Sequence, residues 1–565
     1  MSHTPIRWME TLRARRALIG CAAVMVAATP AAAAVLHVPS AFPTIADALS
    51  TAADGDVIQL APGVYDTPFS FGFKAVTLRG NPAEPAATVL APQTVDAREL
   101  LTIPAFPEGG TILLDGLTIG GFATFSVIDG TLALRDCVVT ADGGGLSVAF
   151  SVAGGSLTAE RVAVADTGYE PHDVALFRIE QGYASLSQCD VLHGSRPLFA
   201  ATSAECVLAS STIAGLNLDL LPTPVGAVQA SGGSLVVSDC TFDAIAPGSG
   251  VVASWCDLTV AGSSFHAVAD PFYGVDAPIH AQGPGVVLSG CHFTAGGSFE
   301  GPASAAVIAS GNYLVEDCVV ANNIPSDVGC GGLSVSGTGT IRSTSFTGNS
   351  TFGSGGALRI AGVASVETCQ FDGNLGGEGD GAVRVTGTAT FVGCRFAGNV
   401  GGDGFYAAPV HGGALGVVGG VAQLTDCLFL GNQALSNGKD VGFGGAISVR
   451  SGGSAALAGC TILGNVAQTA GGGVCLETGA ALAISASSVC DNLPDQVFGA
   501  FSDGGGVVLC GCDGDLNGSG GVDAADLAIL LGLWGPCGAT AGDLVPDGQV
   551  DAADLAVLLG AWGPC

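Results

Sequence analysis

A six-residue motif that ends in Gly-Asn recurs through the second half of the chain and constrains the fold more than any other feature. Its copies begin about 25–33 residues apart: Thr344–Asn349, Cys369–Asn374, Cys394–Asn399, Cys427–Asn432 and Cys460–Asn465. Gly-Gly-Ala-Leu or Gly-Gly-Ala-Ile segments stand between several of them. The first position of the motif can be followed towards the N-terminus through residues that are mostly small. Cys137 and Gly116 are among them, and Arg161 is an exception in size. The mean spacing is about 26 residues. Such a period indicates stacked supersecondary units.

Each unit contains two or three short apolar strands separated by glycine turns, and no unit can bury its apolar face alone. Stacking in register pairs every strand with its equivalents in neighbouring units, which predicts an all-β solenoid. The pattern resembles the right-handed parallel β-helices of the pectin-lyase-like superfamily. The motif that ends in Gly-Asn and the Gly-Gly-Ala segments together resemble the repeats of chlamydial polymorphic outer-membrane proteins. The resemblance implies a right-handed parallel β-helix of about 15 or more rungs over residues 66–509.

Two columns of the repeat are predicted to be structural ladders. The first motif position alternates between Cys, Ser, Thr and Gly, which indicates a small buried side chain, and Cys suits such a place as a small hydrophobe. Unpaired thiols are expected, with disulfides between adjacent rungs as the alternative. The Asn column is expected to stack its amides at a turn, so replacing Asn374 by Ala costs about 1–2 kcal/mol.

Composition excludes several other classes. Charged residues make up 12% of the chain and apolar residues 48%, whereas long disordered chains combine low hydrophobicity with high charge. The 89 glycines disfavour a helical bundle, because each weakens a helix by about 1 kcal/mol relative to Ala. The net charge of −32 repels phosphate backbones and excludes nucleic acid as an expected partner. Calcium, or a neutral or cationic polymer, suits this charge better than an anionic polysaccharide.

The N-terminus has the features of an export signal. A basic stretch over residues 7–16 precedes an apolar stretch that ends in four alanines, which suit signal-peptidase cleavage after Ala34. Residues 1–34 are therefore expected to be a signal peptide, and the mature protein to be secreted or at the cell surface. A lipoprotein box at Cys21 and a twin-arginine signal are the alternatives. No later segment holds about 20 uninterrupted apolar residues, so no membrane span is expected in the mature chain.

Residues 35–65 are expected to cap the N-terminal end of the solenoid, whose open strand edges need cover. This segment contains apolar residues at the i, i+3, i+4, i+7 spacing of a short amphipathic helix: Ile45, Ala48, Leu49 and Ala52. The opening resembles the N-terminal cap of many exported β-helix proteins.

One segment resembles a catalytic motif. Tyr169-Glu-Pro-His-Asp173 is similar to the Asp-Pro-His-Asp/Glu motif of mannuronan epimerases, in which a Tyr and a His act as acid and base beside a carboxylate. The resemblance implies His172, Glu170 and Asp173 as candidate catalytic residues. Glu170 stands in place of the family's Asp, and Tyr169 is adjacent to it instead of three residues upstream. A loop between rungs is therefore the simpler interpretation.

Residues 510–565 form a separate small unit with an internal duplication. Segments 522–537 and 550–565 are nearly identical, and each overlaps an acidic loop with the EF-hand spacing of oxygen ligands. The candidate calcium ligands are Asp515, Asn517, Ser519, Gly521, Asp523 and Asp526 in the first loop, and Asp543, Asp547, Gln549, Asp551 and Asp554 in the second. Val545 replaces one ligand, so the second site is expected to be weaker. Helices are predicted over 524–533 and 552–561.

A loop followed by one helix, duplicated, resembles a type I dockerin. The Trp-Gly-Pro-Cys endings resemble dockerin-like tails of planctomycete exported proteins. The resemblance implies calcium as cofactor and a cohesin-like or surface-anchoring protein as partner. Dockerins recognise cohesins through loop positions 10 and 11, which are Ala-Ala in both repeats here. This departure weakens the expectation of a cohesin partner.

A unit as small as the tail is expected to need both a hydrophobic core and disulfide bonds for stability. The apolar residues expected to pack between its two helices are Leu527, Leu530, Leu531 and Trp534 on one side and Leu555, Leu558, Leu559 and Trp562 on the other. Four cysteines surround the unit and allow three pairings, between which the sequence does not choose: Cys510, Cys512, Cys537 and Cys565.

Two function classes remain. The first is a non-catalytic scaffold or glycan-binding adhesion module that is attached through the tail. The alternative is a polysaccharide-acting enzyme, namely a lyase, hydrolase or epimerase. A face with three or more clustered carboxylates and an Arg or His would favour the enzyme, and no such cluster is apparent in the sequence. The expected partner in either case is a polysaccharide or a cell-envelope component.

Overall fold

The computed structural model describes most of the chain beyond the predicted leader. The described residues are 32–67, 69–91, 101–103, 110–120, 125–141, 150–166, 175–194, 197–216, 218, 226–245, 249–266, 277–294, 306–324, 329–402, 410–436, 441–510, 514–517, 521–536, 542–545 and 547–564. Residues 1–31 of the predicted signal peptide lie outside them. Of the helices found in these ranges, none is long and apolar enough to cross a membrane.

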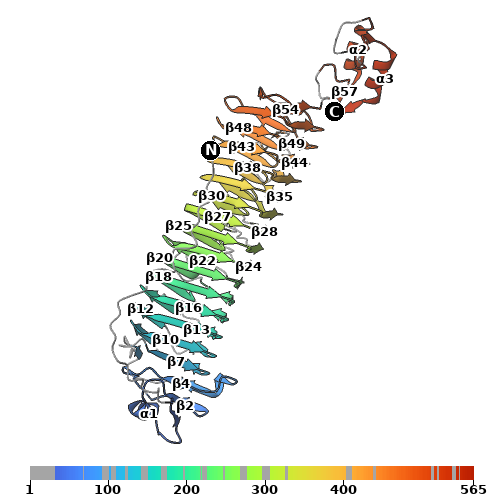
Figure 1. Cartoon of the computed structure of the whole chain (residues 1–565). Helices are drawn as coiled ribbons and strands as arrows, with labels where there is room; N and C mark the ends of the chain where they lie inside the picture. The colour runs from blue at the N-terminus through green and yellow to red at the C-terminus, as the bar shows by residue number, and fades with distance from the viewer. Residues whose placement is uncertain are drawn as a thin grey trace.

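Most of the chain forms a parallel β-solenoid, which runs from blue to orange in Figure 1. A representative turn consists of four short strands: β37 (Val383–Val385), β38 (Thr388–Val392), β39 (Arg395–Ala397) and β40 (Val400–Gly401). The first two belong to one 31-stranded sheet, and the third belongs to a second sheet. Each strand pairs in parallel with its equivalents in the neighbouring turns, as β37 does with β33 (Leu358–Ile360) and β42 (Leu415–Val418). The predicted all-β parallel solenoid is confirmed.

The strand columns differ in length. The sheet of the first two columns begins at β1 (Val35–Val38), and the third column begins at β3 (Gly63–Tyr65) and ends at β56 (Val508–Leu509). Among the described residues, a fourth column runs from β32 (Ser350–Thr351) to β50 (Val466–Ala467). Each strand of this fourth column starts directly after a Gly-Asn motif. The motif therefore makes the corner that introduces a fourth strand into the turn.

Alternate residues of each strand point into the coil and form a continuous core. The Phe of the motif stacks from turn to turn, with ring centroids 4.9 Å apart for Phe346 and Phe371, 4.7 Å for Phe371 and Phe396, and 4.5 Å for Phe396 and Phe429. Parallel pairing in register places equivalent residues directly above one another, so one aromatic position becomes a stack.

The small-residue column lies inside the coil, as predicted. Every free cysteine of the described residues is buried. The Sγ of Cys240 donates to the carbonyl of Ser238 (3.2 Å), and burial raises the pKa of Cys240 to about 11. Two assignments were wrong: strand pairing places Val162 and Leu117 in the column, one residue after Arg161 and Gly116. Both replacements are buried and apolar, which is what the interior demands.

The predicted Asn ladder is continuous from Asn323 to Asn492, with side chains at most 1% exposed. The Nδ2 of Asn374 donates to the Oδ1 of the next Asn (3.0 Å) and to the carbonyl of Phe346 (3.0 Å). Its Oδ1 accepts from the backbone N–H and the Nδ2 of the preceding Asn (both 3.0 Å). Gln496 ends the ladder, because its Oε1 accepts from the N–H and Nδ2 of Asn492 (3.2 and 2.8 Å).

A glycine column lies at the corner between the first two strands of a turn. A Cβ at Gly337, Gly362 or Gly387 would overlap the carbonyl oxygen of the corner glycine one turn earlier. Turns therefore meet backbone to backbone at this corner. This close approach requires glycine and accounts for part of the high glycine content.

The N-terminal end carries α1 (Ile45–Thr51), which packs near β1 and β2 (Val57–Leu60). Thr44 is its N-cap and accepts from the N–H of Asp47 (3.1 Å). β1 and β2 pair in parallel, so this segment also supplies the first strands of the stack. A short 3₁₀ helix, η1 (Pro85–Ala87), follows. The buried residues of α1 are those of the predicted spacing: Ile45, Ala48 and Leu49.

The tail lies beyond the last turns in Figure 1 and contains α2 (Ala524–Gly532) and α3 (Ala552–Gly560). Asp523 and Asp551 cap these helices in capping boxes. Two antiparallel strand pairs connect the repeats: β57 (Gly521–Val522) with β60 (Gly563–Pro564), and β58 (Gly535–Pro536) with β59 (Gln549–Val550).

The core of the tail differs from the prediction. Leu531, Trp534, Leu559 and Trp562 were expected inside but are 47–52% exposed. A nine-residue helix packs only one face against the core. Successive residues of a helix point about 100° apart, so the neighbour of a buried residue lies on another face. Leu530 and Leu558 occupy the packed face, so their neighbours Leu531 and Leu559 face outward. The buried residues are Val522, Leu530, Val550 and Leu558.

The disulfide pairing also differs from the prediction. Cys510 is bonded to Cys490 at the end of β53 (Ser488–Cys490), with a Cα–Cα distance of 4.7 Å. Cys490 belongs to the solenoid and lies outside the four cysteines that are expected to pair around the tail. The disulfide therefore joins the last two turns and not two parts of the tail. Cys512, Cys537 and Cys565 lie outside the described residues.

Candidate functional site

The candidate catalytic residues Glu170, His172 and Asp173 lie outside the described residues. Their segment joins β14 (Ala163–Asp166), in the third column of one turn, to β15 (Phe177–Glu180), in the first column of the next. This position is a connection between rungs. Their catalytic role stays a prediction.

In the first candidate calcium loop the carboxylate at position 12 is fully buried. The Oδ1 of Asp526 accepts from the N–H of Asn517 (3.0 Å), and its Oδ2 accepts from the N–H of Asp523 (2.9 Å). Burial by itself raises the pKa of this carboxyl, but the backbone donors outweigh it and hold the pKa below its ordinary value. Asp515 and Gly521 are also described, whereas Ser519 lies outside the described residues.

The second loop has the same arrangement. Asp554 accepts from the N–H groups of loop positions 9 and 3 (2.7 and 2.8 Å), and these donors lower its pKa. Asp543 at position 1 accepts from the N–H groups of positions 5 and 6 (3.2 and 3.0 Å). The residues that donate within the loop are Val545, Asp547, Gly548, Gln549 and Asp551.

The predicted donors of both loops are oxygen atoms, which a hard cation such as calcium prefers. In the part of the tail that is described, no group of three or more Asp, Glu, His or Cys side chains is placed to hold a metal ion. The carboxylates of Asp526, Asp543 and Asp554 instead accept from N–H groups of the loop backbone. The donor chemistry fits calcium, and calcium binding itself stays a prediction.

Outward-facing charges on the solenoid pair from turn to turn. Asp115 of β7 (Thr111–Asp115) lies between Arg79 and Arg135, which occupy the equivalent positions of the neighbouring turns. The Nε of Arg79 and the Nη2 of Arg135 each lie 2.8 Å from the Oδ2 of Asp115. Burial opposes the charge on Asp115, but the two guanidinium groups outweigh it and lower its pKa. Further pairs join turns in the same way: Glu316 with Arg342, and Asp372 with Arg395.

One charged cluster departs from this simple pairing. It is built around Asp380, whose side chain is fully buried. Arg450, at the end of β47 (Ile447–Arg450), donates from Nη1 and Nη2 to the two carboxylate oxygens (2.7 and 2.8 Å). The Nη1 of Arg384 on β37 lies 3.6 Å from the same carboxylate. Arg450 therefore reaches back across β42 to a residue two turns earlier.

Small residues make room for this cluster. A Cβ at Gly416 of β42 would overlap the Asp380 carboxylate, so glycine is required there. His411 stacks on Phe443 of β46 (Gly442–Phe443) with ring centroids 5.4 Å apart. Its carbonyl accepts from the N–H of Asp380. Burial, together with nearby Arg450, lowers the pKa of His411.

Reasoning from sequence missed this cluster because Asp380 and Arg450 are 70 residues apart. A signal was nevertheless present. Leu358–Ile360 and Val383–Val385 are three-residue strands with an Arg between two apolar residues. The alternation places Arg359 and Arg384 at the same outward position of consecutive turns.

An open groove of about 510 Å³ crosses the corners of several turns. Its floor is formed by corner glycines, such as Gly155, at which a Cβ would clash with the backbone of the preceding turn. Tyr183, at the start of β16 (Tyr183–Ser187), is 39% exposed beside this floor. The polar residues that line the groove include Asp129, Thr131, Ser156, Gln181, Ser203 and Glu205.

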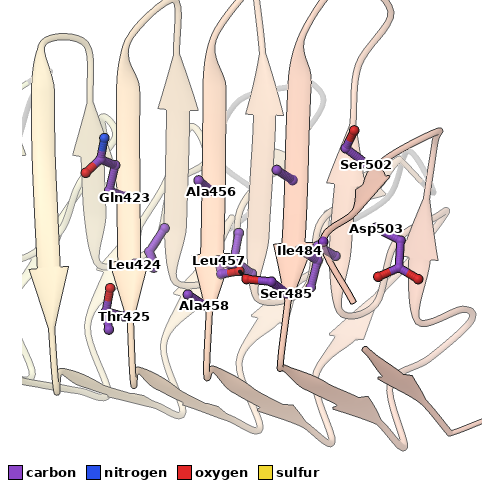
Figure 2. A pocket seen from close by; sticks show the side chains of 12 residues that line it. Gln423, Leu424, Thr425, Ala456, Leu457, Ala458, Ile484, Ser485, Ser502 and Asp503 are labelled. Carbon is purple, nitrogen blue, oxygen red and sulfur yellow. Dashed lines mark hydrogen bonds between the residues drawn. The ribbon is translucent and has the colours of Figure 1, made fainter. Parts of the chain in front are cut away.

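A second groove of about 380 Å³ lies near the C-terminal end of the stack, over β43 (Val421–Thr425), β48 (Ser454–Ala458), β52 (Ala481–Ser485) and β55 (Ser502–Asp503). Figure 2 shows Gln423 at one side of this hollow and Asp503 at the other, with Ala456 between them. Alanine at outward positions of the middle strands leaves the space. Among the lining residues, Asp503 is the only acid.

No protein-family model and no curated protein matches the chain. Tailspike protein 3 of bacteriophage CBA120 is 11% identical, with a TM-score of 0.30 over 77% of this chain and 55% of that one. The chain thus spans about half the length of the tailspike. The catalytic unit of a thermostable GH87 α-1,3-glucanase from Streptomyces thermodiastaticus is 15% identical, with a TM-score of 0.22 over 86% and 70% of the two chains.

The catalytic domain of a GH87 α-1,3-glucanase in complex with nigerose is 13% identical, with a TM-score of 0.21 over 85% of this chain and 70% of that one. Similarities this distant carry no argument about function. The class of the protein follows from its own strand pairing, which defines a parallel β-solenoid with a small helical tail.

Proposed function

We propose that the protein is an exported, surface-attached β-solenoid that binds glycans without transforming them. The groove beside Tyr183 carries this proposal. An exposed aromatic ring can stack on the apolar face of a sugar, and the hydroxyl and amide groups of Thr131 and Gln181 can bond to sugar hydroxyls. The groove crosses several turns, as a chain of linked sugars requires. The rigid stack keeps these groups in place, which lowers the entropic cost of binding.

The tail is proposed to bind calcium and to attach the solenoid to a cohesin-like or other surface-anchoring protein. The oxygen donors of its two loops support calcium, since carboxylate and carbonyl oxygens are the ligands this ion prefers. The basic and apolar N-terminal segment supports export.

A polysaccharide-acting enzyme is the second candidate function. The observation that favours it is that Asp129 and Glu205 line the same groove. Glycoside hydrolysis uses two carboxyl groups that flank the scissile bond. In this case the groove beside Tyr183 would hold the reacting sugar.

Incubating the mature protein with a panel of neutral polysaccharides, with and without calcium, tests both functions. Retention and newly formed reducing ends are measured together. We expect retention without cleavage, weakened at least tenfold in Tyr183→Ala. Phe498→Ala is the matched control, because Phe498 is an exposed aromatic residue (50%) that does not line this groove.

Two outcomes contradict the proposal. Cleavage that is lost in Asp129→Asn and Glu205→Gln would establish the enzyme. Retention of no neutral polymer, or equal retention by Tyr183→Ala and the parent protein, would remove this groove as the binding site.

A further inference from the structure

Several arginines on the outer surface of the solenoid pair with acids of neighbouring turns. Arg135 lies 2.8 Å from Asp115, and Arg342 lies 2.9 Å from Glu316. Opposite charges on adjacent strands stabilise a sheet, whereas like charges directly opposite one another destabilise it. The chain contains 17 Lys and Arg against 49 Asp and Glu, so acidic partners are plentiful.

Arg359 and Arg384 depart from this pattern. They are direct partners in the parallel register of β33 and β37. Adjacent strands lie about 4.8 Å apart, so two like-charged side chains leave the same face of the sheet side by side. Ser334 holds the equivalent position one turn earlier. Three polar side chains therefore form a track along the axis of the stack.

The nearest buried acid compensates this pair only in part. Both oxygens of Asp380 accept from Arg450, at 2.7 and 2.8 Å. Arg384 approaches the same carboxylate only to 3.6 Å. Arg359 has no ion pair with any residue that the structure describes. One buried carboxylate is thus shared by Arg450 and Arg384 while Arg359 has none among the described residues, so positive charge is in excess at this pair.

The surroundings of the Arg384 side chain also favour the binding of an anion. Its Nε is buried and has no hydrogen-bond partner in the described part of the chain. Burial, with Arg450 and Arg359 nearby, lowers the pKa of Arg384, although Asp380 and Glu378 act in the opposite direction. A group in this position gains from an anion that supplies both a charge and an acceptor.

We propose that Arg359 and Arg384 form an anion-binding site for the carboxylate or sulfate groups of an acidic polysaccharide. The inference rests on the glycan binding proposed above and names a class of glycan for a second site. A planar guanidinium group donates two parallel N–H bonds to such an anion, and a shared anion relieves the repulsion between the two arginines.

This site revises the expectation drawn from net charge. The total charge of −32 disfavours an anionic polymer only at long range, because exposed charges more than about 8 Å apart are screened at physiological ionic strength. Close to the sheet, the two arginines decide the interaction. Binding is therefore expected at 0.15 M salt, on the order of physiological ionic strength, in spite of the overall acidity.

Calorimetry of the full mature protein tests the proposal with four probes. They are an oligogalacturonate, its carboxyl-reduced neutral form, a sulfated galactan oligosaccharide, and inorganic sulfate. The variants are Arg359→Gln, Arg384→Gln and the double substitution. Arg342→Gln is the matched control, because Arg342 is an outward arginine with an acidic partner. Retention of neutral polysaccharides by the Tyr183 groove is measured in parallel.

We expect at least one acidic oligosaccharide to bind, at least tenfold more weakly in the double variant and unchanged in Arg342→Gln. The urea midpoint without ligand should stay the same or rise in Arg359→Gln, because a repulsion is removed. The oligosaccharide with higher affinity identifies the group as carboxylate or sulfate.

Three results would overturn the site: no binding of either acidic oligosaccharide, equal binding by the double variant, or inorganic sulfate binding as tightly as both sugars. If neutral polysaccharides are still retained, glycan binding stands while the anion site fails. If they are not retained and the acidic sugars bind through the arginines, the Tyr183 groove fails while the anion site stands.

Discussion

Replacing Asn374 by Ala removes one step from the middle of the Asn ladder. The change leaves the backbone N–H and one side-chain N–H of Asn349 without their acceptor, and the carbonyl of Phe346 without its side-chain donor. All of these groups lie at a buried corner. An unsatisfied buried polar group costs about 1–3 kcal/mol. The free energy of unfolding should therefore fall by at least about 3 kcal/mol, more than the sequence alone predicted.

Urea unfolding and hydrogen exchange of the mature protein measure this loss. Because a solenoid is stabilised by nearest-neighbour contacts, protection should fall around β35 (Gln370–Asp372) and persist in β10 (Thr131–Arg135). Asn81→Ala is the control, since it removes only an exposed turn bond to the N–H of Ala83 (3.1 Å) and should cost less than about 1 kcal/mol. Equal losses in the two variants would refute the reasoning.

Four further outcomes are expected. Gly362→Ala forces a Cβ against the backbone of the preceding turn and should lower stability by about 1–3 kcal/mol in urea unfolding, whereas Gly560→Ala, which has open space around it, should not destabilise. The lowered pKa of Asp115 stabilises the fold above the unfolded pKa, so stability should fall below about pH 4 in the parent and be flatter in Asp115→Asn. Burial raises the pKa of Cys240 to about 11, so its thiol should resist a thiol reagent until urea is added, and reaction of the native protein would contradict the buried column. Asp554→Ala removes the acceptor that closes the second loop, and calorimetry should show reduced calcium uptake by the mature protein, with unchanged uptake contradicting the assignment.

The repeat makes the interior of the solenoid predictable from the sequence. In a parallel stack, equivalent residues of successive turns meet the same surroundings, so the motif predicted where Asn374 stacks and where the small Cys column lies. Its register could still slip by one residue, as it did at Arg161 and Gly116. Spacing alone does not tell a buried position from its exposed neighbour when the side chain is atypical, whereas strand pairing does.

In the tail, too, the sequence predicts the secondary structure better than it predicts which side chains are buried. Loop spacing and apolar periodicity predicted both helices nearly to the residue. They placed Leu530 and Leu558 inside correctly, but they did not separate these from neighbours that face outward. Val522 and Val550, which precede the helices, complete the core, and Trp534 and Trp562 remain half-exposed. A short helix offers several apolar faces, and the partner that packs against it decides between them.

The sequence by itself determined a stacked all-β solenoid, its internal ladders and a duplicated acidic tail, because a repeated local pattern repeats its own environment. The tertiary structure alone decided what lies on the outer surface. The contact of Arg450 with Asp380, the adjacent pair of Arg359 and Arg384, and the groove beside Tyr183 all join residues of different turns. Connections between strands vary in length from turn to turn. The meeting of outward side chains therefore depends on three-dimensional placement and not on the period.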